Sequence, residues 1–125
     1  MKSTKKIFYV DGAGADVHGK GSGFAWVRKD KEKQRVQWID GLTNNEAEYW
    51  ALIDVLRYLA RGSHAVIFTD SQLVAYQFSG HYRAHKPQLQ LLLSRVNTII
   101  CEKRLEIEVR WIPRESNEAG ELLER

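Results

Sequence analysis

Two aspartates stand in equivalent places, each directly after a β-rich apolar run. Asp11 follows the run at residues 7–10, and Asp70 follows the run at 65–69. If the two runs are parallel neighbouring strands, both carboxylates project from the edge where open α/β sheets bind ligands. Two carboxylates a few ångströms apart repel each other and persist when a cation lies between them. The pair therefore predicts a metal site, whereas either aspartate alone is typical of a turn or cap.

Glu48 adds a third carboxylate in the first turn of a predicted long helix. Acidic side chains in a first turn interact favourably with the helix dipole, and this effect alone accounts for Glu46. For Glu48, which lies beside the apolar face of the helix, the dipole effect and a ligand role both stay open. Three acids without a Cys or His cluster favour a hard, oxygen-binding ion, Mg²⁺ or Mn²⁺.

Other common catalytic motifs are missing from the sequence. The glycines between residues 12 and 23 lead into a predicted strand instead of a helix, so they do not form the dinucleotide-binding fingerprint. The chain contains no nucleophile elbow and no Cys/His pair. The residues by themselves therefore favour metal-assisted attack of water on a phosphodiester, with the ions generating hydroxide and neutralising charge in the transition state.

Length and composition are those of one ordinary domain covering residues 1–125. The 125 residues are 43% apolar and 28% charged, and the only cysteine, Cys101, cannot form an internal disulfide. No apolar stretch approaches the roughly 18 residues of a membrane span. The run at 7–10 is also too short for a signal sequence. We therefore expect a cytoplasmic, monomeric protein that does not associate with membranes.

The charge distribution fits a protein that binds a polyanion around a metal site. The formal net charge is +3, yet residues 41–80 hold 4 acidic against 2 basic side chains. Most domains with so small a charge bind no nucleic acid, so the distribution supports the metal site more than it identifies a partner.

Periodicity predicts nine elements in the order β β β α β α α β α. We expect strands over residues 7–10, 23–28 and 35–39, a helix from 45 to 60 capped by Asn44 or Asn45 and ending before Gly62, a strand over 65–69, helices over 71–78 and from Pro87 to 100, a strand over 105–111, and a short helix from Asn117 to Leu123. The first three strands form an antiparallel meander, and helical crossovers join the later ones. The fold class is therefore α/β, a mixed five-stranded sheet with helices on both faces.

Four short strings, in this order and spacing, resemble type 1 ribonuclease H. They are Asp11-Gly12, Asn44-Asn45-Glu46-Ala47-Glu48-Tyr49, Thr69-Asp70-Ser71-Gln72 and Trp111-Ile112-Pro113-Arg114-Glu115-Ser116-Asn117. The resemblance covers almost the whole chain and implies a ribonuclease H-like fold. It also implies an endonuclease that cuts the RNA strand of RNA/DNA hybrids, leaving 5′-phosphate and 3′-hydroxyl ends. Two divalent ions would be held by four carboxylates, and Asp11, Glu48 and Asp70 match three of them.

The position of the fourth acid departs from the family pattern. The family continues from Pro-Arg-Glu-x-Asn through two residues to Ala-Asp-x-Leu. Without a gap, Glu121 takes the place of this Asp, and Leu123 falls on the Leu. A one-residue deletion would instead place Gly120 there and leave one ligand missing. The ungapped alignment keeps the charge of the site, so we assign Glu121 as the fourth metal-binding and catalytic acid.

By resemblance, six residues contact the hybrid. These are Gly12, Asn44, Asn45, Ser71, Gln72 and Arg114. The amide groups both donate and accept hydrogen bonds, as readout of hydroxyls and base edges requires. The chain lacks the basic handle that some family members insert. The loop at 79–86, with His81, Tyr82, Arg83 and Lys86, is either a small basic and aromatic surface or an ordinary solvated loop.

A second function stays open, a hybrid-binding module that has lost efficient catalysis. The changed residues at 120 and 121 favour it. So does the loop at 114–116, which lacks the histidine that assists proton transfer in some family members.

Overall fold

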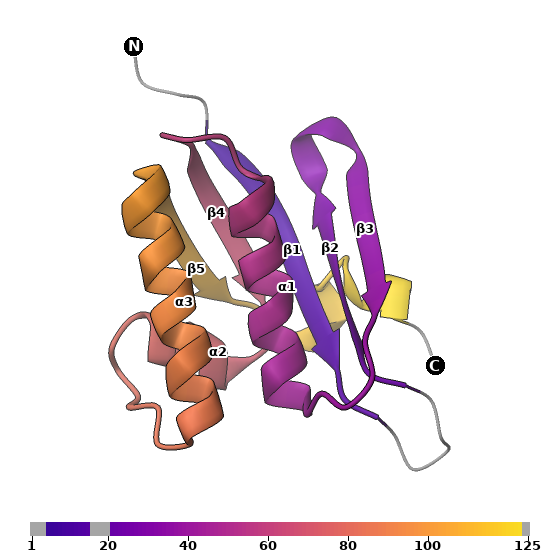
Figure 1. The fold of residues 1–125 in the computed structure, drawn as a ribbon. Coiled ribbons are helices and arrows are strands. Elements are labelled where there is room, and N and C mark those ends of the chain that lie inside the picture. Colours follow the sequence, from indigo (N-terminus) through magenta and orange to yellow (C-terminus); the bar gives the residue numbers. More distant parts are fainter. Residues whose placement is uncertain (1–4, 16–20, 124–125) are drawn as a thin grey trace.

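The computed structural model describes residues 5–15 and 21–123, which form a five-stranded sheet with the order β3-β2-β1-β4-β5 (Figure 1). The strands are β1 (Lys6–Ala13), β2 (Gly23–Arg28), β3 (Lys33–Trp38), β4 (His64–Thr69) and β5 (Glu106–Trp111). β2 pairs antiparallel with β1 and β3, whereas β4 pairs parallel with β1 and β5. The predicted mixed sheet is therefore confirmed.

The first strand continues beyond its predicted end. Asp11 and Gly12 lie within β1, because their backbones pair with Ala25 and Phe24 of β2. The Asp11 carboxylate therefore projects from a hydrogen-bonded ladder and not from a turn. The other strands differ from the prediction by two residues or fewer at either end, where the ladder hydrogen bonds stop.

Helix α1 (Asn44–Tyr58) begins with a capping box. The Thr43 hydroxyl accepts a hydrogen bond from the Glu46 backbone at 3.2 Å, and the Glu46 carboxylate accepts one from the Thr43 backbone at 3.0 Å. The predicted cap, Asn44 or Asn45, was wrong, because Thr with Glu three residues later satisfies two backbone donors at once. The helix ends at Leu59, where the backbone becomes extended, and Gly62 lies in the following turn with φ +80°.

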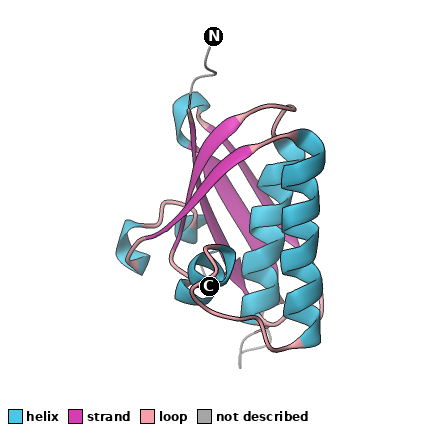
Figure 2. Cartoon of the chain, turned by 90° about the vertical axis from the view of Figure 1, so that its left-hand side faces the viewer, coloured by secondary structure: helices cyan, strands magenta, loops and turns pink. Residues whose placement is uncertain are grey.

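Two further helices complete the layer above the sheet. Helix α2 (Gln72–Phe78) is short, and helix α3 (Pro87–Lys103) has the predicted proline in its first turn. The two long helices, α1 and α3, run side by side on the same face of the sheet (Figures 1 and 2). The main core lies between these helices and the sheet, and its largest fully buried side chains include Trp26, Tyr49, Phe8, Leu52 and Ile53.

The C-terminal segment lies on the opposite face as two 3-10 turns, η2 (Arg114–Ser116) and η3 (Gly120–Leu123). Leu123 packs there with Ala13 and Ala25. Because side chains alternate along a strand, Ala25 points away from the face that Phe24 and Trp26 bury. The predicted short final α-helix is thus a 3-10 turn. On the second face these turns lie over Ala13 of β1 and Ala25 of β2, while both long α-helices share the first face.

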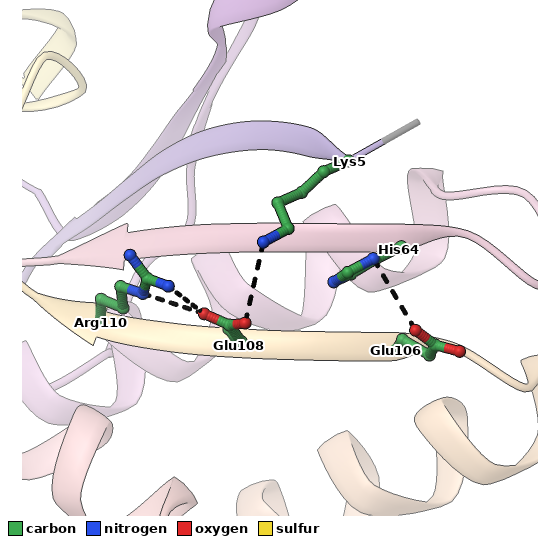
Figure 3. A network of polar contacts seen from close by, with 5 residues as sticks. All are labelled: Lys5, His64, Glu106, Glu108 and Arg110. Carbon is green, nitrogen blue, oxygen red and sulfur yellow. Dashed lines mark hydrogen bonds and ion pairs between the residues drawn. The ribbon is translucent and has the colours of Figure 1, made fainter. Parts of the chain in front are cut away.

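Charged side chains occupy that second face over β4 and β5 (Figure 3). Glu108 pairs with Arg110 at 2.5 Å and with Lys5 at 3.9 Å, and His64 lies 3.7 Å from Glu106. Exposed pairs of this kind contribute about 0–1 kcal/mol each. Their main effect is therefore to give this part of the sheet a polar surface that faces water. Among the helices of the described residues, none combines the length and apolar character that crossing a membrane requires.

Candidate active site

Three carboxylates from distant parts of the chain meet at one end of the sheet. Asp11 lies in β1, Glu48 in the first turns of α1, and Asp70 directly after β4. One oxygen of each lies within 4.8 Å of the others. The parallel register, which pairs Val10 with Thr69, places the two aspartates side by side on neighbouring strands. The structure thus brings together the three acids that the sequence singled out.

Glycine at position 12 allows α1 to lie directly against β1. A Cβ atom there would lie 2.3 Å from the Ala47 carbonyl carbon and from the Glu48 nitrogen, far inside van der Waals contact. Gly12 therefore brings the Glu48 backbone onto the strand that carries Asp11. Two residues after Gly12, the Gly14 nitrogen donates a hydrogen bond of 2.5 Å to the Asn44 side chain. This bond fixes the start of α1 against the end of β1.

The cluster carries more negative charge than its surroundings compensate. Burial raises the pKa of Glu48 well above its ordinary value, and the nearby charges of Asp11 and Asp70 raise it further. Burial, followed by repulsion from Asp70, raises the pKa of Asp11 to about 6. Glu48 is 8% exposed, and among the described residues its Oε2 atom has no hydrogen-bond partner.

This donor set fits a divalent cation. A cation between the carboxylates would give the buried oxygen a ligand and remove the repulsion that raises both pKa values. All the donors in the cluster are carboxylate oxygens, which suit hard ions such as Mg²⁺ or Mn²⁺.

Asn117 connects the cluster to the C-terminal turns. Its side-chain nitrogen donates hydrogen bonds to the Val10 carbonyl at 2.9 Å and to the Asp70 carboxylate at 3.2 Å. Its side-chain oxygen accepts one from the Ala119 nitrogen at 3.1 Å. The sequence predicted Asn117 only as a helix cap. The signal for more was its place in the string that begins at Trp111, because an asparagine can hold a carboxylate and a backbone together.

The acids lie in a cleft of about 740 Å³. Its lining residues are Asp11, Gly12, Ala13, Asn44, Glu48, Asp70, Arg114, Glu115, Asn117, Gly120, Glu121 and Leu123. Glu121 is exposed on η3 and lies outside the group of three carboxylates that approach one another. A Cβ atom on Gly120 would lie 3.5 Å from an Asp11 carboxylate oxygen, an ordinary contact distance. Both candidate positions for a fourth acid therefore border the cleft.

The predicted substrate contacts are spread over the cleft and its surroundings. Gly12, Asn44 and Arg114 line the cleft itself, and Asn45 lines a smaller neighbouring pocket of about 240 Å³. Ser71 caps α2 by accepting a hydrogen bond from the Val74 nitrogen at 3.1 Å. Gln72, the first residue of α2, is exposed.

The loop at 79–86 contributes to other surfaces. His81, Tyr82 and Arg83 line a separate groove against α3, and Lys86 lines the small pocket beside Asn45. Tyr82 packs edge-on against Tyr76 at a centroid distance of 5.0 Å. The loop is therefore partly ordered by aromatic packing, and its role in binding stays a prediction.

A family model described as reverse transcriptase-like matches residues 10–123. The chain belongs to this family. The matched span contains every residue of the carboxylate cluster and both C-terminal turns. The departures at 120 and 121 are therefore changes within the family, not evidence against membership.

Several known proteins that the chain resembles carry the ribonuclease H name. The structure of LC11-RNase H1 in complex with RNA/DNA hybrid matches with a TM-score of 0.80 at 30% identity, covering 94% of this chain and 92% of that one. Ribonuclease H of Parvibaculum lavamentivorans is 39% identical over 67 residues, which are 53% of this chain and 45% of that protein. The bifunctional protein Rv2228c of Mycobacterium tuberculosis is 34% identical over 83 residues, which are 65% of this chain and 22% of that protein.

The chain thus spans less than half the length of these two curated relatives. The resemblance to type 1 ribonuclease H and the predicted ribonuclease H-like fold are both confirmed.

Proposed function

We propose that the protein is an endoribonuclease that hydrolyses the RNA strand of RNA/DNA hybrids. The observation that carries this proposal is the cluster of Asp11, Glu48 and Asp70, buried enough to raise two of the pKa values and open to a cleft. A chain of the same fold, LC11-RNase H1, has been solved with an RNA/DNA hybrid, which supports this substrate class. The carboxylate cluster and the proposed substrate together favour hydrolysis over binding alone.

In this proposal the carboxylates hold two Mg²⁺ or Mn²⁺ ions. When bound, such ions activate water and neutralise the charge that develops on a phosphodiester. Asp11 in β1, Glu48 in α1, Asp70 directly after β4 and Glu121 on η3 are the acids that would hold these ions. Asn117 orients Asp70 through its hydrogen bond. Cleavage would leave 5′-phosphate and 3′-hydroxyl ends.

The cleft supplies groups suited to both parts of a nucleic acid. The Arg114 guanidinium offers charge and paired donors to a phosphate, as arginine does in many phosphate sites. The amides of Asn44, Asn45 and Gln72 suit the 2′-hydroxyls and base edges that an A-form minor groove displays. Ser71, which caps α2, and the Gly12 backbone complete the proposed contacts.

A second candidate is a hybrid-binding module with weakened catalysis. The exposure of Glu121, outside the group of three carboxylates, favours it. Both candidates share the cleft and the substrate and differ only in the completeness of the metal site.

Cleavage of an end-labelled RNA/DNA hybrid separates the two. The protein is incubated with hybrid in Mg²⁺ and, separately, in Mn²⁺, with single-stranded RNA and duplex RNA as controls. Internal cuts confined to the hybrid, with 3′-hydroxyl ends that a polymerase extends, are expected. Tight hybrid binding without cuts in either ion would establish the binding module. Absence of both binding and cuts would overturn both candidates. The monomeric state, the cytoplasmic location and the organisation as one domain over 1–125 remain predictions.

A further inference from the structure

We propose that Trp38 is a substrate-contacting residue, which packs against the hybrid where it extends from the carboxylates toward β3. This inference rests on the proposed function and adds a binding residue that the family motifs do not include.

Trp38 lies on the same face and at the same end of the sheet as Asp11. Ala13 pairs with Gly23, and Gly23 pairs with Trp38, so these three residues form one row across β1, β2 and β3. Asp11 lies two residues before Ala13 on β1, where it pairs with Ala25, so its row projects to the same face. Paired residues of a sheet project to the same face. The indole therefore lies on the face that carries Asp11, beyond Leu123, which packs over Ala13 and Ala25 between the cleft and β3.

Gly23 provides the surface against which the indole lies. A Cβ atom on Gly23 would lie 2.6 Å from Cε3 and 3.1 Å from Cδ2 of Trp38. The ring thus covers the position that a side chain at residue 23 would occupy. The glycine backbone supports the ring, and Trp38 is 52% exposed, so contact with a ligand costs little further side-chain freedom.

Trp38 is unusually exposed for its residue type. It is 52% exposed, whereas Trp26 is 2% exposed in the core. Trp111, 40% exposed, lies at the end of β5 and is already held beside the acids, because its indole nitrogen donates to the Asp70 carbonyl at 3.2 Å. A large aromatic ring exposed next to a polar cleft is typical of a binding site.

The distance between Trp38 and the acids suits a nucleic acid duplex. Neighbouring strands are about 4.8 Å apart and residues rise about 3.3 Å along a strand, so the Asp11 and Trp38 backbones are roughly 12 Å apart. A duplex advances about 3.4 Å per base pair, so this separation corresponds to roughly three to four base pairs. The wide, shallow minor groove of an A-form hybrid leaves sugar and base edges accessible to an aromatic ring.

The test compares Trp38→Ala with hybrids of different lengths. Binding is measured with the Asp70→Asn background, so that cleavage does not consume the probe, and cleavage is measured with the otherwise unchanged protein. On a hybrid with at least six base pairs on each side of the cleavage site, Trp38→Ala is expected to weaken binding roughly five- to tenfold. Trp38→Phe should recover most of this loss.

Truncating the hybrid provides the decisive comparison. When one side is shortened to two base pairs, the duplex no longer reaches Trp38, and Trp38→Ala should bind like its parent. Shortening the other side should leave the difference unchanged. Leu91→Ala, which removes a side chain that is 72% exposed on α3, is the matched control and should bind normally on every hybrid.

Two outcomes would overturn the inference. Equal binding by Trp38→Ala on long hybrids would show that the ring makes no contact. A loss of the same size on every hybrid, or a lowered melting temperature that accounts for it, would show a structural role. If the otherwise unchanged protein neither binds nor cuts hybrids, the proposed function fails before Trp38 is tested.

Discussion

Among the acids of the described residues, only Glu48 is buried, with 8% of its surface exposed. It begins on a helix whose first turns lie against β1, and its carboxylate is buried between two aspartates. Such a group is stable as an anion only with a cation beside it, and as a neutral acid without one. Metal binding and protonation are therefore competing ways of stabilising the same residue.

The first prediction concerns Asp70→Asn. We expect hybrid cleavage to fall by more than about 100-fold, because a metal ligand is lost. The fold should persist, and the metal-free melting temperature should stay equal or rise, since repulsion with Asp11 is relieved. Cleavage assays and thermal unfolding in EDTA measure the two effects. The control is Glu108→Gln, which removes an acid of β5 that is paired with Arg110. This variant should cut the hybrid normally. Normal cleavage by Asp70→Asn would contradict the assignment of the site.

The second prediction concerns pH. The folded-state pKa of Asp11 is raised from 3.8 to about 6, and that of Glu48 is also raised, so the folded state binds these protons more tightly than the unfolded chain. The metal-free protein should therefore lose stability as pH rises from about 4 through 6 and above. Urea unfolding in EDTA between pH 4 and 8 measures the free energy of unfolding of the protein and of Glu48→Gln. This free energy should fall less steeply with pH in Glu48→Gln. An equal fall of this free energy with pH in both proteins would refute the prediction. Added Mg²⁺ should abolish the loss of stability near pH 7.

The third prediction addresses the fourth acid. Glu121→Gln should lower the cleavage rate by roughly tenfold or more if Glu121 completes the site. Gly120→Asp should then give no gain. An unchanged rate in Glu121→Gln together with faster cleavage by Gly120→Asp would instead favour the gapped alignment. Both variants change residues that border the cleft, so melting temperatures are measured beside the rates.

At the scale of elements, the close packing of α1 against β1 positions the carboxylates of the site. Glycine is required at position 12 because the backbone of α1 occupies the space that a side chain would fill.

The fourth prediction is that Gly12→Ala destabilises the protein by about 1–3 kcal/mol or more and weakens Mn²⁺ binding, because α1 must move. Urea unfolding and calorimetric titration measure these effects. Gly21→Ala, whose added Cβ would meet Asp40 at 3.7 Å, is the control, and equal behaviour of the two variants would contradict the argument.

The elements themselves could largely be predicted from hydrophobic periodicity. The β4 run and the α1 stripe are long and regular, and both occur where expected. The ends were harder to predict. Thr43 caps α1 because of a reciprocal hydrogen bond with Glu46, and β1 continues to Ala13 because β2 pairs with it. Such ends depend on contacts that periodicity does not contain.

At the scale of the whole molecule, Asp11 and Asp70 could be predicted together because parallel strands end at one edge of a sheet, whereas Glu48 was assigned through the resemblance to ribonuclease H. Asn117 and Trp38 could not be placed in this way. The role of Asn117 depends on bonds to residues more than forty positions away, and that of Trp38 on a row across three strands. Both are results of tertiary packing. The position of Glu121 depends on a 3-10 turn, where the sequence predicted an α-helix.

The central place of β1 also has a dynamic consequence. The β1 wall of the cleft, residues 11–13, pairs with β2 on one side and packs at Gly12 against the backbone of α1, so amides there should exchange with deuterium slowly. The opposite wall consists of 3-10 turns with local bonds such as Gly120 to Asn117 at 3.1 Å. Amides in these turns should exchange through local opening. The cleft therefore has one wall of paired strand and another of short turns held through Asn117 and Leu123, so a bound duplex should slow exchange chiefly in the C-terminal turns.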